Sequence, residues 1–201
     1  MKNIINKYIY LNGRNVIFGL LSACFFSLIV LDSNKYYSVA LIMAPSLLFS
    51  FVVGKMCYEE DSKSTKEFLL SLPMIKGNIV LEKNIVGQIC ILVGMILVNG
   101  IFLMVNILRN TAPIFDIRSI LIIWIFLIVY NTIYVFLNYR LNYSKTQFTT
   151  YIIVALMLVL FKFGNNFIIT INSINLYLLI IIVVVVSYIS LIITKNIKWR
   201  P

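Results

Sequence analysis

The sequence YEEDSKSTKEFLLSLPMIKGNIVLEK, residues 58–83, is the longest segment of this chain that a lipid bilayer would reject. It lies between two apolar runs, so it marks where the chain leaves the bilayer and where it returns. A polar stretch runs from Glu59 to Glu67, a compact apolar patch follows, and Pro73 closes that patch. Ser64 and Glu67 have the spacing of a capping box at a helix start. We therefore predict a short surface helix, apolar on one side and accessible to a partner.

Composition places most of this chain in lipid rather than in water. Of its 201 residues, 61% are hydrophobic and 12% are charged, and the mean hydropathy is +0.98. A soluble domain averages about 45–50% apolar and about 25% charged residues. A soluble fold of this size cannot bury so much apolar surface, so the chain is predicted to be an integral membrane protein.

Six apolar runs are each about as long as the roughly 20 residues that cross a hydrocarbon core as a helix. Their apolarity is continuous, whereas the strands of a membrane barrel alternate and are shorter. The sequence therefore predicts one all-α transmembrane domain, residues 1–201, with six transmembrane helices. These helices are expected near 14–32, 36–57, 84–107, 119–138, 149–170 and 176–194.

The first 13 residues have the pattern of an interfacial amphipathic helix that Gly13 ends. The alternative is a merely polar leader to the first span. A cleavable signal is not favoured, because the first apolar run begins only near Val16 and no small-residue cleavage site follows. The residues on the apolar face are Ile4, Ile5, Tyr8 and Leu11.

Basic residues are distributed unequally between the two sides of the predicted bundle. Of the 17 Lys and Arg residues, 13 flank one set of connections, three flank the other, and Lys162 falls inside the fifth span. The positive-inside rule then predicts a multi-pass protein of the cell membrane with both termini and residues 58–83 in the cytoplasm. The larger set is Lys2, Lys7, Arg14, Lys55, Lys63, Lys66, Lys76, Lys83, Arg140, Lys145, Lys195, Lys198 and Arg200, and the smaller set is Lys35, Arg109 and Arg118.

Polar residues inside the predicted spans are costly in lipid and are candidates for a translocation path. The candidates are Gln88, Asn99, Asn131 and Lys162. The alternative is that the amides hydrogen-bond between helices and that Lys162 extends to the outer surface. Small residues repeat every fourth position at Gly19, Ala23 and Ser27, which indicates close helix packing within one chain or between two chains.

The polar segment also carries the resemblance to a known family. Glu59-Glu60-Asp61, the run Lys66-Glu67-Phe68-Leu69-Leu70-Ser71-Leu72-Pro73, and then Lys76, Ile79-Val80 and Lys83 resemble the segment after the second span in small ABC transporter permeases of type 2. In that family this segment is the coupling helix, which docks on a separate ATPase subunit. We call residues 58–83 the coupling segment.

This resemblance implies an exporter that works as two permeases with two ATPases, with ATP and magnesium bound by the ATPases alone. The implied cargo is a peptide, an antimicrobial agent or another amphipathic compound. For docking we predict that Phe68, Leu69 and Leu72, next to Pro73, fill a groove on the ATPase. Glu59, Glu60 and Asp61 are predicted to make contacts at the rim.

Other functions are less well supported by the sequence. No GxxxxGK[ST] phosphate loop occurs, so the chain is not expected to hydrolyse ATP. The seven acidic residues all lie at or outside the predicted span ends, which disfavours an intramembrane enzyme. With no histidine, and three cysteines in no metal-ligand spacing, no metal site is expected. Nucleic-acid binding is also not expected, because the basic residues flank apolar runs. A non-transporting membrane protein that recruits a cytoplasmic partner remains the alternative.

Overall fold

Helices make up every regular element among the residues that the structure describes, and no strand occurs in that part of the chain. This computed structural model describes residues 2–30, 37–61, 76–111, 117–141, 143–163 and 175–196. The elements are α1 (Lys2–Val30), α2 (Tyr37–Phe49), the π-helix η2 (Ser50–Gly54), α3 (Lys55–Glu60), α5 (Lys76–Leu108), α6 (Ile117–Arg140), α7 (Tyr143–Phe163) and α9 (Leu176–Lys195). The prediction of an all-α protein is confirmed for the described residues.

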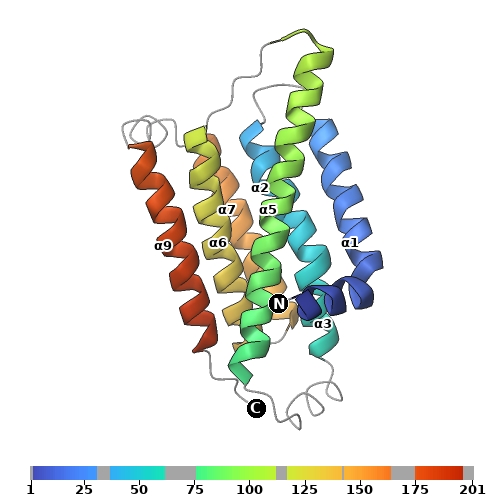
Figure 1. Cartoon of the computed structure of the whole chain (residues 1–201), viewed down its shortest axis with the longest axis vertical. Coiled ribbons are helices and arrows are strands. Elements are labelled where there is room, and N and C mark those ends of the chain that lie inside the picture. The colour runs from blue at the N-terminus through green and yellow to red at the C-terminus, as the bar shows by residue number, and fades with distance from the viewer. Residues whose placement is uncertain are drawn as a thin grey trace.

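The helices run up and down alongside one another as a bundle (Figure 1). Elements α2, η2 and α3 follow one another without a break and form one long rod. Helix α5 contacts α1, α2, α6 and α9, so it is the element around which the others are arranged. Its extended length, 33 residues, exceeds the roughly 20 residues that a hydrocarbon core requires.

Five described helices are long and apolar enough to cross a membrane. These candidate spans are Gly13–Val30, Tyr37–Glu60, Val80–Leu108, Ile117–Arg140 and Leu176–Lys195. Each matches one predicted run, and the remaining predicted run, 149–170, overlaps α7. The prediction that Gly13 ends the first helix was wrong, because α1 continues through Gly13 without interruption.

Close packing between spans depends on small residues at two contacts. A Cβ atom added to Gly94 of α5 would lie 2.6 Å from the Cα of Pro45 in α2, so only glycine permits this approach. At Gly19 of α1 an added Cβ would lie 2.9 Å from a Leu48 methyl group. Ala23 and Ser27, on the same stripe as Gly19, are fully buried within the chain. The small-residue stripe of the first span therefore serves packing within one chain.

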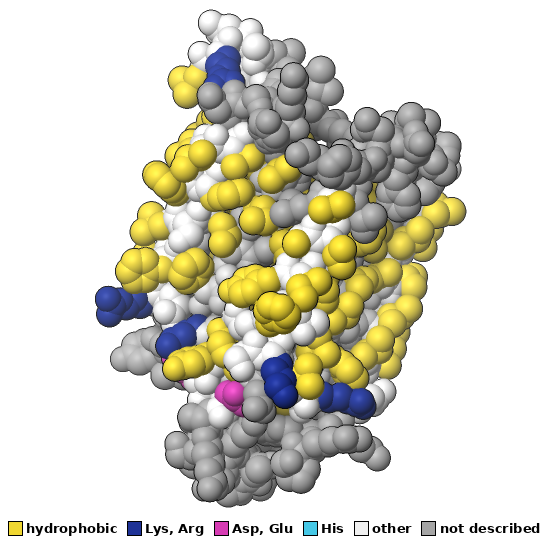
Figure 2. All heavy atoms as spheres, turned by 180° about the vertical axis from the view of Figure 1, so that it is seen from behind, with side chains coloured by type: hydrophobic (Ala, Val, Ile, Leu, Met, Phe, Trp, Pro, Cys, Tyr) yellow, Lys and Arg dark blue, Asp and Glu magenta, His cyan; other side chains and the backbone are white. Residues whose placement is uncertain are grey.

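The basic side chains of the described residues lie mostly at one end of the bundle. In the face shown in Figure 2, Lys and Arg side chains gather near the lower end and the middle of the surface is largely hydrophobic. Lys55, Lys83 and Arg140 belong to helix ends that share this end of the bundle, whereas Arg109 and Arg118 lie at the opposite ends of α5 and α6. This segregation agrees with a bundle whose two ends face different compartments.

Candidate functional site

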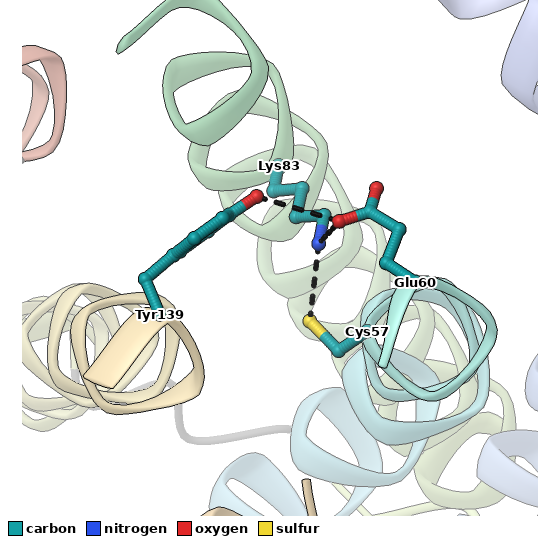
Figure 3. A network of polar contacts seen from close by, with 4 residues as sticks. All are labelled: Cys57, Glu60, Lys83 and Tyr139. Atoms are coloured by element: carbon teal, nitrogen blue, oxygen red, sulfur yellow. Dashed lines mark hydrogen bonds and ion pairs between the residues drawn. The ribbon is translucent and has the colours of Figure 1, made fainter. Parts of the chain in front are cut away.

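Four side chains meet where the rod α2–η2–α3 ends, at the point where the coupling segment leaves the bundle (Figure 3). The ammonium group of Lys83, on α5, forms an ion pair with Glu60 Oε2, on α3. It also lies 3.7 Å from Cys57 Sγ and 4.9 Å from the centre of the Tyr139 ring, on α6. The Tyr139 hydroxyl donates to the same Glu60 oxygen at 3.5 Å. We call these four residues the ion-pair cluster.

Burial makes this ion pair sensitive to any change in either partner. The Lys83 side chain is 0% exposed and the Glu60 side chain is 18% exposed. A buried ammonium group is stable only when it is paired and hydrogen-bonded, because removal from water costs several kcal/mol per ion. The carboxylate, the thiol and the face of the tyrosine ring together supply that compensation. The cluster therefore fixes the relative positions of α3, α5 and α6 at this end.

The ion-pair cluster connects the two helices from which the coupling segment leaves and to which it returns. Glu60 is the last residue of α3, and Lys83 lies near the start of α5, so the pair joins the two helices that carry residues 62–75 between them. The structure does not describe residues 62–75. The buried Glu60–Lys83 pair therefore links the two helices at the ends of this segment.

A second contact extends this connection to α7. Asp61, directly after α3, accepts a hydrogen bond from the backbone N–H of Tyr143, the first residue of α7, at 3.1 Å. A carboxylate at a helix N-terminus satisfies a free donor and interacts favourably with the helix dipole. The rings of Tyr58 and Tyr143 also meet edge to face, with their centroids 5.3 Å apart. The end of α3 is thus bonded to α5, α6 and α7.

A buried hydrogen-bond network continues from Asn84, the residue after Lys83. Asn131 of α6 donates to the Asn84 side-chain oxygen at 2.5 Å and to its backbone oxygen at 3.0 Å. The Asn84 amide donates in turn to the hydroxyls of Ser190 and Thr194 on α9, at 2.9 and 3.0 Å. Gln88, one turn along α5, also donates to Ser190, at 3.3 Å. This amide network joins α5, α6 and α9.

Two buried polar atoms have no hydrogen-bond partner within the described part of the chain, the Asn131 Oδ1 atom and the Tyr134 hydroxyl. Unsatisfied groups of this kind are costly in a medium of low dielectric constant. Both belong to α6 and lie at packed positions, since an added Cβ on Gly87 would clash with the Asn131 amide and one on Gly54 would lie 3.5 Å from the Tyr134 hydroxyl.

The predicted translocation-path residues do not gather at one place. Asn131 and Gln88 belong to the amide network, whereas Asn99 accepts a hydrogen bond from the Tyr37 hydroxyl at 2.5 Å and donates to the Met95 carbonyl at 2.8 Å. Lys162 belongs to α7, but its side chain lies outside the described residues. The three amides thus make the contacts expected for hydrogen bonding between and within helices, and a role in a path stays a prediction.

The predicted ATPase contacts divide into three groups. Glu59 is exposed and pairs with Lys55 at 3.9 Å, whereas Glu60 and Asp61 already bond other helices of this chain. The apolar residues of the patch lie outside the described residues. They are Phe68, Leu69, Leu72 and Pro73.

The sequence placed Lys83 in the coupling motif but did not mark it as the centre of a buried cluster. It also did not single out Cys57, Tyr139, Asn84 or Ser190. The one available signal was the position of opposite charges at the two ends of the segment, Glu60 and Lys83. A small polar residue in a long apolar helix, such as Ser190 in α9, gives little indication of its partner.

These groups are suited to holding the helices of this end together. Among the described residues, no group of three or more Cys, Asp or Glu side chains is placed to bind a metal ion. The ion-pair cluster instead concentrates four contacting side chains from three elements at the base of the coupling segment. The ion-pair cluster therefore serves to connect α3, α5 and α6, and its chemistry is not that of a catalytic site.

Comparison with known proteins gives one match. A family model described as "ABC-2 family transporter protein" matches residues 3–198, nearly the whole chain. No curated protein and no solved structure matches this sequence.

Proposed function

Because this chain belongs to the ABC-2 family of transporter proteins, we propose that it is the permease subunit of an ATP-driven exporter whose ATPase is a separate polypeptide. The family match over residues 3–198, together with the apolar spans, is the observation that carries the permease assignment. A separate ATPase is supported by the sequence, which contains no phosphate-binding loop.

In this proposal six helices cross the membrane, with α7 as the fifth. The N-terminal part of α1 lies in the headgroup plane, and the coupling segment, residues 58–83, provides the coupling helix in the cytoplasm. In Figure 1 the first part of α1 runs across the lower end of the bundle before the helix turns upward, which supports an interfacial position. The cytoplasmic placement of this end is supported by the concentration of basic residues there.

The ion-pair cluster suggests how movement of an ATPase would reach the spans. ATP binding draws the two ATPases together, and each would then push on the coupling helix docked to it. The Glu60–Lys83 pair joins α3 to α5, and Tyr139 and the Asp61–Tyr143 bond extend the connection to α6 and α7. The helices at this end would therefore move as a unit between two arrangements, a population shift powered by nucleotide binding.

Docking would depend on the apolar patch of the coupling segment. Phe68, Leu69 and Leu72 would enter a groove on the ATPase, while Glu59 would contact the rim. Glu59 suits this role best among the three neighbouring acids, because its side chain is 53% exposed. Glu60 and Asp61 serve contacts inside the chain, so we assign them to transmission rather than to recognition.

The complete transporter would contain two permeases and two ATPases, and its cargo would be peptides, antimicrobial agents or other amphipathic compounds. ATP and magnesium would bind only to the ATPases. Six spans are few for enclosing a wide path, which supports a pair of permeases. Gln88, Asn99, Asn131 and Lys162 remain the proposed polar positions along the path.

Co-purification of the ATPase from membranes tests the docking proposal. Phe68→Ala should weaken the recovery of the ATPase, by about 1–3 kcal/mol of binding free energy if this side chain is a hot spot. Phe148→Ala is the matched control, because Phe148 is a 69% exposed phenylalanine on α7, outside the coupling segment. Recovery of the ATPase should be unchanged in the control.

Two outcomes would contradict the proposal. Equal recovery of the ATPase with wild type and with Phe68→Ala would remove the coupling segment as the docking element. A recovered complex whose ATP hydrolysis is not stimulated by any amphipathic compound or peptide would favour a protein that only recruits a partner.

A further inference from the structure

An open pocket of about 550 Å³ lies next to the contact between α3 and α7, and Tyr58 and Tyr143 of that contact line it. Its lining comes from four elements, α1, η2, α3 and α7, through residues such as Asn15, Ser50 and Lys55. It therefore forms where helices distant in sequence meet, and part of its wall is a π-helix, an irregularity that occurs frequently at functional sites.

The pocket carries a cation and no acidic residue in its lining. The Lys55 ammonium group lies 4.8 Å above the centre of the Tyr58 ring, which holds the charge at the pocket wall. Glu59 lies 3.9 Å from the same ammonium group, but this pair is largely exposed, and exposed pairs contribute little. An anionic ligand can therefore take the place of Glu59 at Lys55.

Hydrogen-bond donors lie on the α7 side of the pocket. Gln147 donates to the Tyr143 hydroxyl oxygen at 2.5 Å, and this bond does not use the O–H donor of Tyr143.

The lining of the pocket changes along the helices, from a charged residue near the end of the bundle to aromatic residues deeper in the bundle. Lys55 lies five residues before the end of the candidate span Tyr37–Glu60, about 8 Å at 1.5 Å per residue. Tyr151, on the opposite wall, lies eight residues beyond Tyr143, about 12 Å further along α7. Tyr151 and Phe51 are 63% and 39% exposed, so aromatic surface is open to the surroundings at the deeper level. A charged end and an aromatic end at this spacing suit an amphiphile.

We propose that this pocket binds the headgroup and upper acyl chains of an anionic phospholipid, with Lys55 and Tyr143 contacting the phosphate. The aromatic rings at the deeper level would pack against the acyl chains, as aromatic residues do at membrane interfaces. The site neighbours the Asp61–Tyr143 contact, so a bound lipid would hold α3 and α7 together. The inference does not rest on the exporter assignment.

Native mass spectrometry of the purified full chain, titrated with phosphatidylglycerol or phosphatidylcholine, tests the site. The wild type should retain one phosphatidylglycerol more tightly than phosphatidylcholine. Lys55→Gln should weaken phosphatidylglycerol binding about fivefold, and Tyr143→Phe about threefold. Lys145→Gln removes the same charge from an exposed position on α7 that does not line the pocket, and should leave binding unchanged.

The controls separate a built site from general charge attraction. Equal weakening in Lys55→Gln and Lys145→Gln, or no weakening in either pocket variant, would overturn the proposal. Displacement of the lipid by millimolar glycerol 3-phosphate would also overturn it, because the ligand would then be a soluble phosphate. Thermal unfolding of each variant verifies folding, and Tyr143→Phe, which retains the ring, provides the test if Lys55→Gln does not fold.

Discussion

The loss of stability on breaking the Glu60–Lys83 ion pair depends on which of the two residues is replaced, because their side chains differ in exposure. Glu60→Gln leaves the fully buried ammonium group without its counterion, whereas Lys83→Met leaves a carboxylate that is 18% exposed and can reach water. We expect Glu60→Gln to lower the free energy of unfolding by about 3–5 kcal/mol. Lys83→Met should cost less, and the double variant should be more stable than Glu60→Gln alone. Thermal unfolding in detergent measures all three.

The neighbouring pair provides the control for this prediction. Glu59→Gln breaks an exposed contact with Lys55 one turn away, which should cost no more than about 0.5 kcal/mol. If Lys83→Met destabilised the protein more than Glu60→Gln, the burial argument would be wrong. If Glu59→Gln matched Glu60→Gln, the acidic run would act through its overall charge rather than through one buried contact.

The ion-pair cluster also illustrates which residues the sequence could and could not predict. Glu60 and Lys83 were visible as charges at the ends of the polar segment, and the need to pair charges near lipid is a local rule. Tyr139 and Cys57 were not predictable, because their roles depend on how α6 and α3 rotate toward α5. A tyrosine near the end of a span is common because its ring favours the membrane interface, and a cysteine there packs as a small apolar residue. Neither residue type therefore indicates a buried cluster.

At the scale of elements, the contact between α2 and α5 depends on one glycine, because the neighbouring atom belongs to the backbone of Pro45. Gly94→Ala would place a Cβ 2.6 Å from the Pro45 Cα, and backbone cannot yield as the end of a flexible side chain can. We expect a loss of about 1–3 kcal/mol in the free energy of unfolding, the usual cost of overpacking. Thermal unfolding and the recovery of monodisperse protein measure this loss.

Gly100→Ala is the matched control for that prediction, since it lies six residues further along α5. A Cβ at Gly100 would meet nothing within 4 Å, so the variant should be neutral or slightly more stable, by up to about 1 kcal/mol. Equal destabilisation by the two alanines would indicate that α5 requires flexible glycines throughout. That result would contradict the inference that Gly94 is required for the close approach to Pro45.

Sequence patterns predicted the five candidate spans that the structure describes, and they predicted the helix ends poorly. Apolar runs are set by the thickness of the bilayer, so their existence and approximate positions are visible in the sequence. Helix α5, however, begins at Lys76, eight residues before the predicted span, and α1 passes through Gly13. Polar residues extend a helix into the interface at little cost, so hydropathy alone does not mark the end. The π-helix at Ser50–Gly54 has no sequence signature that we recognise.

At the scale of the whole molecule, burial within the chain is unequal between spans. In an 18-residue apolar stretch of each span, 67% is buried for the rod Tyr37–Glu60 and only 17% for the α1 and α9 spans. The exposed faces of these two helices are apolar and are expected to contact lipid, or a second permease in the assembled transporter. The sequence predicted that much of the chain faces lipid, but the central position of α5 and of the rod depends on tertiary contacts that hydropathy does not encode.

The orientation of the bundle is the property on which the coupling proposal depends, and it is testable in intact cells. The excess of basic residues at one end predicts that residues 58–83 are cytoplasmic and that the turn after α5 faces outward. Thr111, exposed at the end of that turn, and Ser64, in the coupling segment, are suitable sites for single cysteines. Cys57 and Cys90 are buried and should give little background, and Cys24 is replaced by serine. A membrane-impermeant maleimide should label Thr111→Cys in intact cells, and Ser64→Cys only after the membrane is permeabilised. The reverse pattern would place the coupling segment outside, where no ATPase has access to ATP, and both the docking surface and the transmission through Glu60 and Lys83 would have to be abandoned.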